Sequence, residues 1–174
     1  SILASLLEFL QRKGLKHLSV LSEVKILLDT LSDESLTDYN SPKSKQIRLS
    51  KYFDKVKHRV SGKKEAIPIE QITKDLQKKA NHVMQHIRNE EWIETESGSR
   101  FFNGHYDNDG ERVHGDHQLG LRIDLTSQVM SVMFDTATED QVSEIYLSVK
   151  KYLKDPDSPG LRLCTDFKEQ KLNL

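Results

Sequence analysis

The chain has 174 residues, of which 30% are charged and 36% apolar, and its formal net charge is −1. The chain lacks the excess of basic residues that is typical of nucleic-acid-binding proteins, and its apolar runs are too short to span a membrane. The single cysteine, Cys164, excludes an internal disulfide and favours a reducing compartment, so we expect a cytoplasmic protein without a nucleic-acid partner or membrane insertion.

Helical periodicity dominates the first half of the chain. The predicted elements there are helices over 2–12, 16–31 and 47–62, with a polar, turn-rich segment over 32–45. Gly14 follows the first helix as a stop signal, and Pro68 stands at the entrance to a fourth helix. In that fourth helix, over 69–87, apolar residues recur at steps of three and four, which is the clearest amphipathic pattern in the sequence.

The second half begins with a long polar loop over 98–119 that shows no helical period. Helices are predicted again over 123–134 and 138–153, and Thr138 with Gln141 forms the capping-box pattern of a helix start. A turn over 155–160 and a short strand over 161–163 follow. The sequence therefore predicts an all-α fold built from antiparallel helix pairs.

The loop also contains residues that could bind a metal. Read as a calcium loop, it would place His105 at the first ligand position and Asp116 at the last, where a bidentate Glu is required. The cluster of His105, His114 and His117 lacks the helical spacing of a zinc pair, and no cysteine is near it. A tight turn explains the run from Asp107 to Gly110 better, so we expect no metal.

In a barrel of antiparallel helix pairs, the loops that lead into the N-termini of the inner helices line the cleft, and the backbone N–H groups there favour anions. The loop over 98–119 and the helix after it supply six candidate cleft residues: Asn103, Tyr106, Asp107, Arg122, Asp124 and Gln128. Tyr and Asn suit sugars, which are held by stacking and hydrogen bonds. In the competing interpretation Asp124 caps the helix and pairs with Arg122, while Phe101 and Phe102 belong to the core.

Three segments, over 102–113, 121–129 and 160–167, occur in an order that resembles the catalytic domain of the inverting β-glucan phosphorylases, glycoside hydrolase family 94. The 1,2-β-oligoglucan phosphorylases are most similar, and the likeness is best from about residue 75 onward. This resemblance implies that residues 1–174 are a single segment, about half, of an (α/α)6 barrel that continues beyond both ends. His105 and His114 replace residues that are more often Tyr and Glu in the family.

The resemblance also implies an activity, which is phosphorolysis of β-linked glucooligosaccharides to α-glucose 1-phosphate with inversion. Inorganic phosphate is the co-substrate, and no other cofactor is expected. The Asp-Trp-Asn-Asp motif of the catalytic acid and the Lys-Glu-Asn-Gly motif beside the phosphate site are both absent from the sequence. No catalytic residue therefore lies in this segment, which we expect to be inactive without the remainder of its catalytic domain.

Two alternatives to this function remain. The chain could be a non-catalytic helical binding module, or the phosphorylase-like domain of a cyclic β-1,2-glucan synthase. Homodimerisation is a further expectation for the intact protein.

Overall fold

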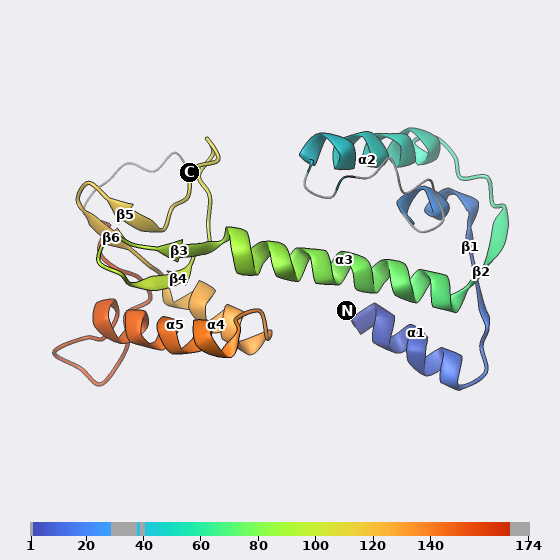
Figure 1. Cartoon of the computed structure of the whole chain (residues 1–174). Helices are drawn as coiled ribbons and strands as arrows, with labels where there is room; N and C mark the ends of the chain where they lie inside the picture. The colour runs from blue at the N-terminus through green and yellow to red at the C-terminus, as the bar shows by residue number, and fades with distance from the viewer. Residues whose placement is uncertain (1, 29–37, 39–40, 168–174) are drawn as a thin grey trace. The chain divides into compact units, whose positions relative to one another are not determined.

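The computed structural model describes residues 2–28, 38 and 41–167, and the chain divides into two compact units, Ser1–Val83 and Met84–Leu174 (Figure 1). The division falls within the long helix α3 (Ile69–Glu90), which contributes to both. The predicted all-α fold is wrong, because three small antiparallel sheets accompany the helices. The expected half of an (α/α)6 barrel is thus corrected to a mixed α/β architecture.

In the first unit, the predicted helix over 16–31 is replaced by a strand and a 3-10 helix. Helix α1 (Ile2–Arg12) is followed by β1 (His17–Leu21), which pairs antiparallel with β2 (Lys64–Pro68). The 3-10 helix η1 (Ser22–Leu27) comes directly after β1. Residues of β1 with long apolar side chains alternate with polar ones, a pattern that suits a half-buried strand better than a helix. The core of this unit contains Leu7, Leu28, Ile67, Ile69 and Ile72.

Helix α2 (Pro42–Val56) corresponds to the third predicted helix but begins and ends earlier. Ser41 caps it by accepting a hydrogen bond from the Ser44 backbone, and Pro42 occupies the first turn, where its missing N–H costs nothing. Residues 29–37 and 39–40, which belong to the predicted turn-rich segment and the end of the helix before it, lie outside the described residues.

The second unit places two short hairpins beside two helices. Strand β3 (Trp92–Glu94) pairs with β4 (Arg100–Phe102), and β5 (Gly115–His117) pairs with β6 (Gly120–Arg122), so the predicted loop over 98–119 contains two strands. Helices α4 (Leu125–Met133) and α5 (Glu139–Tyr152) confirm the last two predicted helices to within two residues.

The capping box at the start of α5 is confirmed, since Thr138 and Gln141 each bond the backbone of the other. The predicted strand over 161–163 is not formed as a strand, and that segment makes one isolated bridge, between Lys154 and Leu161. The core of the second unit consists of Ile93, Phe101, Phe102, Ile123, Ala137, Ile145, Val149 and Leu153. No helix within the described residues combines the length and the apolar character needed to cross a membrane.

Candidate functional site

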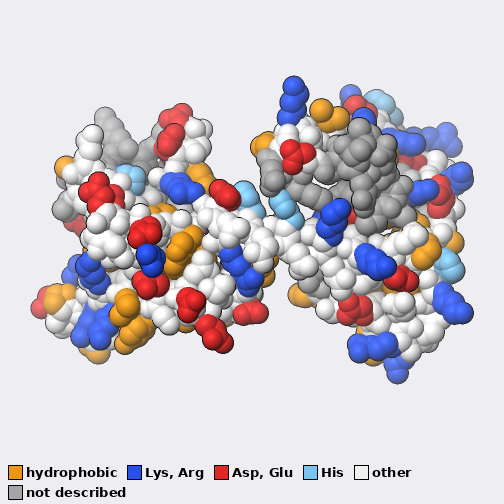
Figure 2. All heavy atoms as spheres, viewed as in Figure 1, with side chains coloured by type: hydrophobic (Ala, Val, Ile, Leu, Met, Phe, Trp, Pro, Cys, Tyr) orange, Lys and Arg blue, Asp and Glu red, His pale blue; other side chains and the backbone are white. Residues whose placement is uncertain are grey.

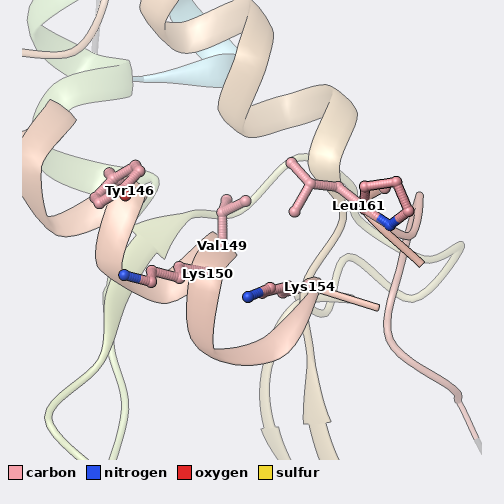
Figure 3. A pocket seen from close by; sticks show the side chains of 7 residues that line it. Tyr146, Val149, Lys150, Lys154 and Leu161 are labelled. Carbon is pink, nitrogen blue, oxygen red and sulfur yellow. The ribbon is translucent and has the colours of Figure 1, made fainter. Parts of the chain in front are cut away.

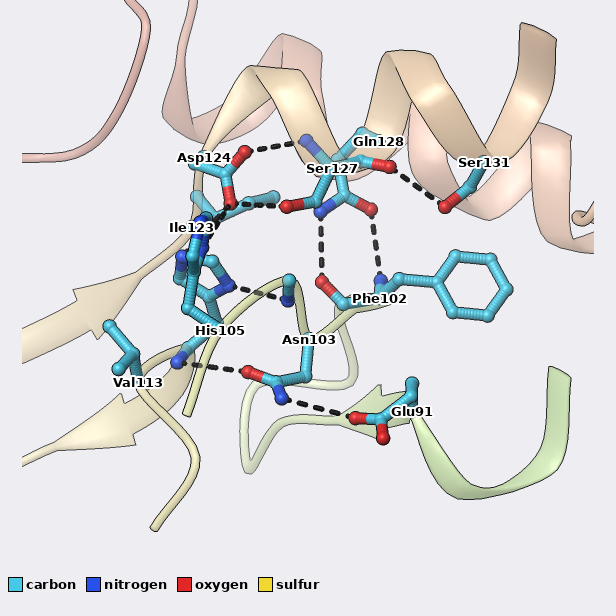
Figure 4. Close-up of polar contacts among 12 residues, drawn as sticks. Glu91, Phe102, Asn103, His105, Val113, Ile123, Asp124, Ser127, Gln128 and Ser131 are labelled. Atoms are coloured by element: carbon cyan, nitrogen blue, oxygen red, sulfur yellow. Dashed lines mark hydrogen bonds and ion pairs between the residues drawn. The ribbon is translucent and has the colours of Figure 1, made fainter. Parts of the chain in front are cut away.

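The polar segment from Asn103 to Val113 starts from a rigid anchor at the end of β4 (Figure 4). The Gln128 side amide, 1% exposed, donates to the Phe102 carbonyl and accepts from the Phe102 N–H, both at 2.9 Å. It therefore serves the backbone as a neighbouring strand would, on the side of β4 that faces α4. Gln128 was a predicted cleft residue, but both polar atoms of its side chain bond the Phe102 backbone.

Asn103 and Tyr106 converge on one carboxylate, that of Glu91. The Asn103 amide donates to Glu91 at 3.1 Å, and the Tyr106 hydroxyl donates to both Glu91 oxygens at 2.9 and 3.0 Å. Asn103 is buried, whereas Tyr106 is 47% exposed. Two of the predicted cleft residues are thus brought together, and the Tyr106 ring is held in place while part of it faces solvent.

Asp107 has a different role, in the turn of the loop. Its Oδ1 atom accepts hydrogen bonds from the backbone N–H groups of Asp109 at 3.0 Å and Glu111 at 2.8 Å. Gly110 completes the turn with a φ of 82°, a left-handed conformation that glycine adopts without strain. Asp107 therefore shapes the loop, as the tight-turn interpretation expects.

Asp124 lies at the centre of the site and caps α4. Its Oδ1 accepts from the Ser127 N–H and its Oδ2 from the Ser127 hydroxyl, both at 2.6 Å. The His114 Nε2 atom lies 2.9 Å from the same Oδ2. Burial raises the pKa of Asp124, but hydrogen bonds from His114 and Ser127 outweigh burial and lower it from 3.8 to about 2. The carboxylate is consequently ionised throughout the physiological range.

The backbone fixes which nitrogen of His114 carries the proton. The Gly104 N–H donates to His114 Nδ1 at 2.9 Å, so this nitrogen is an acceptor and the proton sits on Nε2, which donates to Asp124. The ring is nearly fully buried. His114 is therefore a neutral hydrogen-bond donor wedged between a backbone amide and a carboxylate.

His105 completes the cluster from the solvent side. Its side chain is 63% exposed, its Nδ1 lies 3.8 Å from Asp124 Oδ2, and its ring meets that of His114 edge-on at 5.4 Å between centroids. The ligand atoms of His105, His114 and Asp124 all lie within 4.8 Å of one another, which would suit a metal ion by distance.

The chemistry of the donors argues against that use. A metal would need a lone pair on His114 Nε2, and the proton would have to move to Nδ1, where it would face the Gly104 N–H. Only His105 and Asp124 could then ligate without breaking an existing hydrogen bond. The cluster is better suited to hydrogen bonding than to metal binding.

Gly104 is required at this point by space. A Cβ atom there would lie 1.6 Å from the Ser127 hydroxyl oxygen and 3.1 Å from Asp124 Oδ2. The loop can approach the start of α4, and donate to His114, only because residue 104 has no side chain.

Arg122 lies apart from this cluster. It is buried, its guanidinium carbon lies 5.1 Å from the centroid of the Phe167 ring, and its Nε makes no hydrogen bond within the described part of the chain. Burial and, second to it, the nearby Arg122 charge lower the pKa of His117 below its ordinary 6.5. The expected pair between Arg122 and Asp124 is not found, because the carboxylate bonds His114 and Ser127 instead.

The six predicted cleft residues do not all lie together. Asn103, Tyr106 and Asp124 are brought to one region, Asp107 and Gln128 are structural, and Arg122 lies elsewhere. The residues that the sequence prediction missed as a group are Glu91, Gly104, His114 and Ser127. The sequence offered His105 and His114 as possible metal ligands and as departures from the family pattern. The position of Ser127 three residues after Asp124 was the readable sign of a helix cap.

Comparison with known proteins leaves the family open. No model of a known protein family matches the sequence, and no curated protein matches it.

Proposed function

We propose that this chain supplies a saccharide-binding surface to an enzyme that carries out inverting phosphorolysis of β-linked glucooligosaccharides, with inorganic phosphate as co-substrate. The surface consists of the exposed side chains of His105, which lies beside the Asp124 carboxylate, and Tyr106, the next residue along the chain. The resemblance of the sequence to the β-glucan phosphorylases motivates the reaction, and we place it in the cytoplasm. The chain by itself binds and does not catalyse.

The observation that carries the binding role is the state of Asp124. Cleavage of a glycosidic bond with inversion needs a carboxylic acid that still holds its proton near neutral pH, usually because its pKa is raised. Hydrogen bonds in this site do the opposite, and hold the pKa of Asp124 at about 2. The central carboxylate is ionised and engaged by His114 and Ser127, so it does not suit the role of general acid.

The exposed groups suit a sugar. The Tyr106 ring is held by its hydroxyl proton, which both Glu91 oxygens share, and it is half exposed, so a pyranose ring can stack on it at a small cost in entropy. His105, the residue before Tyr106, is also exposed and offers a ring nitrogen to a hydroxyl group. An aromatic face next to polar acceptors is the usual composition of a carbohydrate site.

Two measurements test the proposal. Calorimetric titration of the chain with β-1,2- and β-1,3-glucooligosaccharides should show binding that Tyr106→Ala weakens roughly tenfold, equivalent to about 1.4 kcal/mol. Phe53→Ala removes a comparably exposed aromatic side chain of α2 and should leave binding unchanged. The second measurement is release of glucose 1-phosphate by the protein purified from its native source.

The outcomes separate the reaction from the binding role. Binding with release of glucose 1-phosphate supports both. Binding without release contradicts the phosphorylase assignment and favours a non-catalytic glycan-binding module. Absence of binding to either glucan, or equal losses for Tyr106→Ala and Phe53→Ala, refutes the saccharide surface itself.

A further inference from the structure

Helix α2 and the loop that follows it carry a concentrated positive charge. Residues 42–64 contain nine Lys or Arg residues and one acidic residue, Asp54. The whole chain has 26 basic and 27 acidic residues, so its net charge of −1 hides this local excess. Figure 2 shows basic side chains, in blue, gathered at the upper right, where α2 ends and the chain continues toward β2.

These cations are open to solvent and have no acidic partners. Arg48 is partly buried, and the other eight Lys and Arg residues of this segment are exposed. None of those eight makes an ion pair within the described part of the chain. An anionic surface that lies against the segment would therefore relieve the mutual repulsion of its charges.

Helix α2 packs on its own unit along one narrow line. Its partly buried residues step by four along the chain, and the helix packs against η1. They are Ser44, Arg48, Tyr52 and Val56. No residue of α2 is fully buried. Most of the surface of this helix is thus available to a partner.

An exposed row of α2 combines apolar and basic side chains. Lys45, Leu49, Phe53 and Lys57 also step by four, so they lie in line along the helix. Leu49 is 41% and Phe53 59% exposed, and a lysine stands at each end of this apolar pair. Lys57 keeps helical φ and ψ angles of −51° and −42°, so it continues the row. Exposed Phe and Leu beside Lys are typical of helices that lie in a membrane interface.

We infer that α2 and the loop after it dock on the surface of an anionic phospholipid membrane. Leu49 and Phe53 reach into the headgroup layer, while the lysines at the ends of the row extend their charges to the lipid phosphates. Attraction to an anionic surface falls off within a Debye length, so charges concentrated in one exposed segment act together. This contact is peripheral and differs from insertion of a helix across the bilayer.

The same charges would attract a nucleic acid, but the apolar residues favour lipid. Proteins that bind nucleic acids place aromatic or hydrogen-bonding side chains where these can reach the bases. Leu49 and Ile47, which is 50% exposed, offer neither. Seven of the nine cations are Lys, which acts as a point charge, whereas Arg binds phosphate through two hydrogen bonds.

This surface is independent of the proposed saccharide surface. Residues 42–64 belong to the first unit, whereas His105 and Tyr106 belong to the second. The inference therefore does not depend on the proposed function, and each can fail without the other.

Co-sedimentation of the 174-residue chain with lipid vesicles tests the inference. We expect binding to vesicles of phosphatidylcholine that contain about one third phosphatidylserine, and a steep loss of binding as the salt concentration rises. Vesicles of phosphatidylcholine alone should bind little. Replacement of both Lys45 and Lys57 by Glu should weaken binding at least about tenfold, and Phe53→Ser should weaken it about tenfold.

The matched control replaces both Lys150 and Lys154 by Glu. These two exposed lysines of the second unit flank a hollow beside Leu161 (Figure 3), and α5 also carries three acidic residues. The control makes the same change in net charge outside the basic segment, so it should bind vesicles as the original chain does. Far-UV circular dichroism checks that each variant keeps its helices.

Loss of binding in the α2 variants, but not in the control, supports the inference. Absence of binding to the anionic vesicles, equal binding to phosphatidylcholine alone, or an equal loss in the control overturns it. Binding that Phe53→Ser leaves unchanged refutes the placement of the apolar pair in the headgroup layer. A single-stranded oligonucleotide that binds more tightly than the anionic vesicles also overturns the inference, and assigns the segment to nucleic acid.

Discussion

Replacement of Asp124 by Asn tests the central electrostatic feature of the site. Asn retains an oxygen that can accept from the Ser127 N–H, so the helix cap survives. Its NH₂ group, however, turns donors toward the His114 Nε2–H and the Ser127 hydroxyl, which donate to the carboxylate in the native chain. The variant should be less stable, and the loss should depend on pH.

The magnitude follows from the depressed pKa. The fall from 3.8 to about 2 for Asp124 corresponds to at most about 2 kcal/mol of stabilisation, and partial solvent screening reduces this to about 1–2 kcal/mol. Because the folded-state pKa is the lower one, this stability is present above pH 3.8 and is lost as the pH falls through about 2. The stability difference between native chain and variant should therefore narrow by about 1 kcal/mol between pH 5 and pH 2.5.

Urea denaturation followed by Trp92 fluorescence measures the stability difference in the second unit, which contains both Trp92 and Asp124. Trp92 is the only tryptophan, and its ring packs edge-on against Phe102 at 4.8 Å between centroids, next to the segment that Gln128 holds. Asp157→Asn, in the exposed turn after α5, removes the same charge as a control. A difference that stays constant from pH 5 to pH 2.5 would refute the role of the ionised carboxylate.

Two further substitutions probe the packing around the site by the same denaturation assay. Gly104→Ala should destabilise the second unit by about 1–3 kcal/mol through the clash with Ser127, whereas Gly160→Ala, which meets only the exposed Ser158 hydroxyl, should change stability by less than about 0.5 kcal/mol; equal effects would contradict the close approach. Gln128→Met keeps the side-chain volume but leaves the N–H and the carbonyl of buried Phe102 unpaired, so it should lower the free energy of unfolding by about 2–4 kcal/mol. An unchanged stability would argue that water takes over both hydrogen bonds.

The parts of the fold that the sequence predicted well are those decided by neighbours in the chain. The amphipathic pattern of α3 and the capping box at Thr138 depend on residues within one or two helical turns, and both are confirmed. The helix predicted over 16–31 failed because β1 is stabilised by β2, whose residue Ile67 pairs with Leu18 across 49 positions. Three-residue strands such as β4 are too short to show a period of two at all.

The candidate site shows the same limit at the level of side chains. Asp124 and Ser127 are three residues apart, so their capping bond could be read from the sequence. The contact of Asp124 with His114 depends on how the hairpin of β5 and β6 returns the chain to the start of α4, and no local pattern encodes it. Gln128 was misread for a related reason, because a buried amide that bonds backbone is identical in sequence to one that faces a ligand.

The hydrogen bonds of the site also decide how it can act. Both His114 nitrogens are engaged, and Asp124 accepts from three donors, so neither can change its protonation state without breaking a contact that holds the loop. His105, which lies beside them, and Tyr106, the next residue along the chain, are open to solvent. Exposed side chains that rest on a rigid, buried hydrogen-bond network are suited to binding, because the protein loses little conformational entropy when a ligand binds. On the proposed function, proton transfer to the glycosidic oxygen must then come from a group outside this cluster.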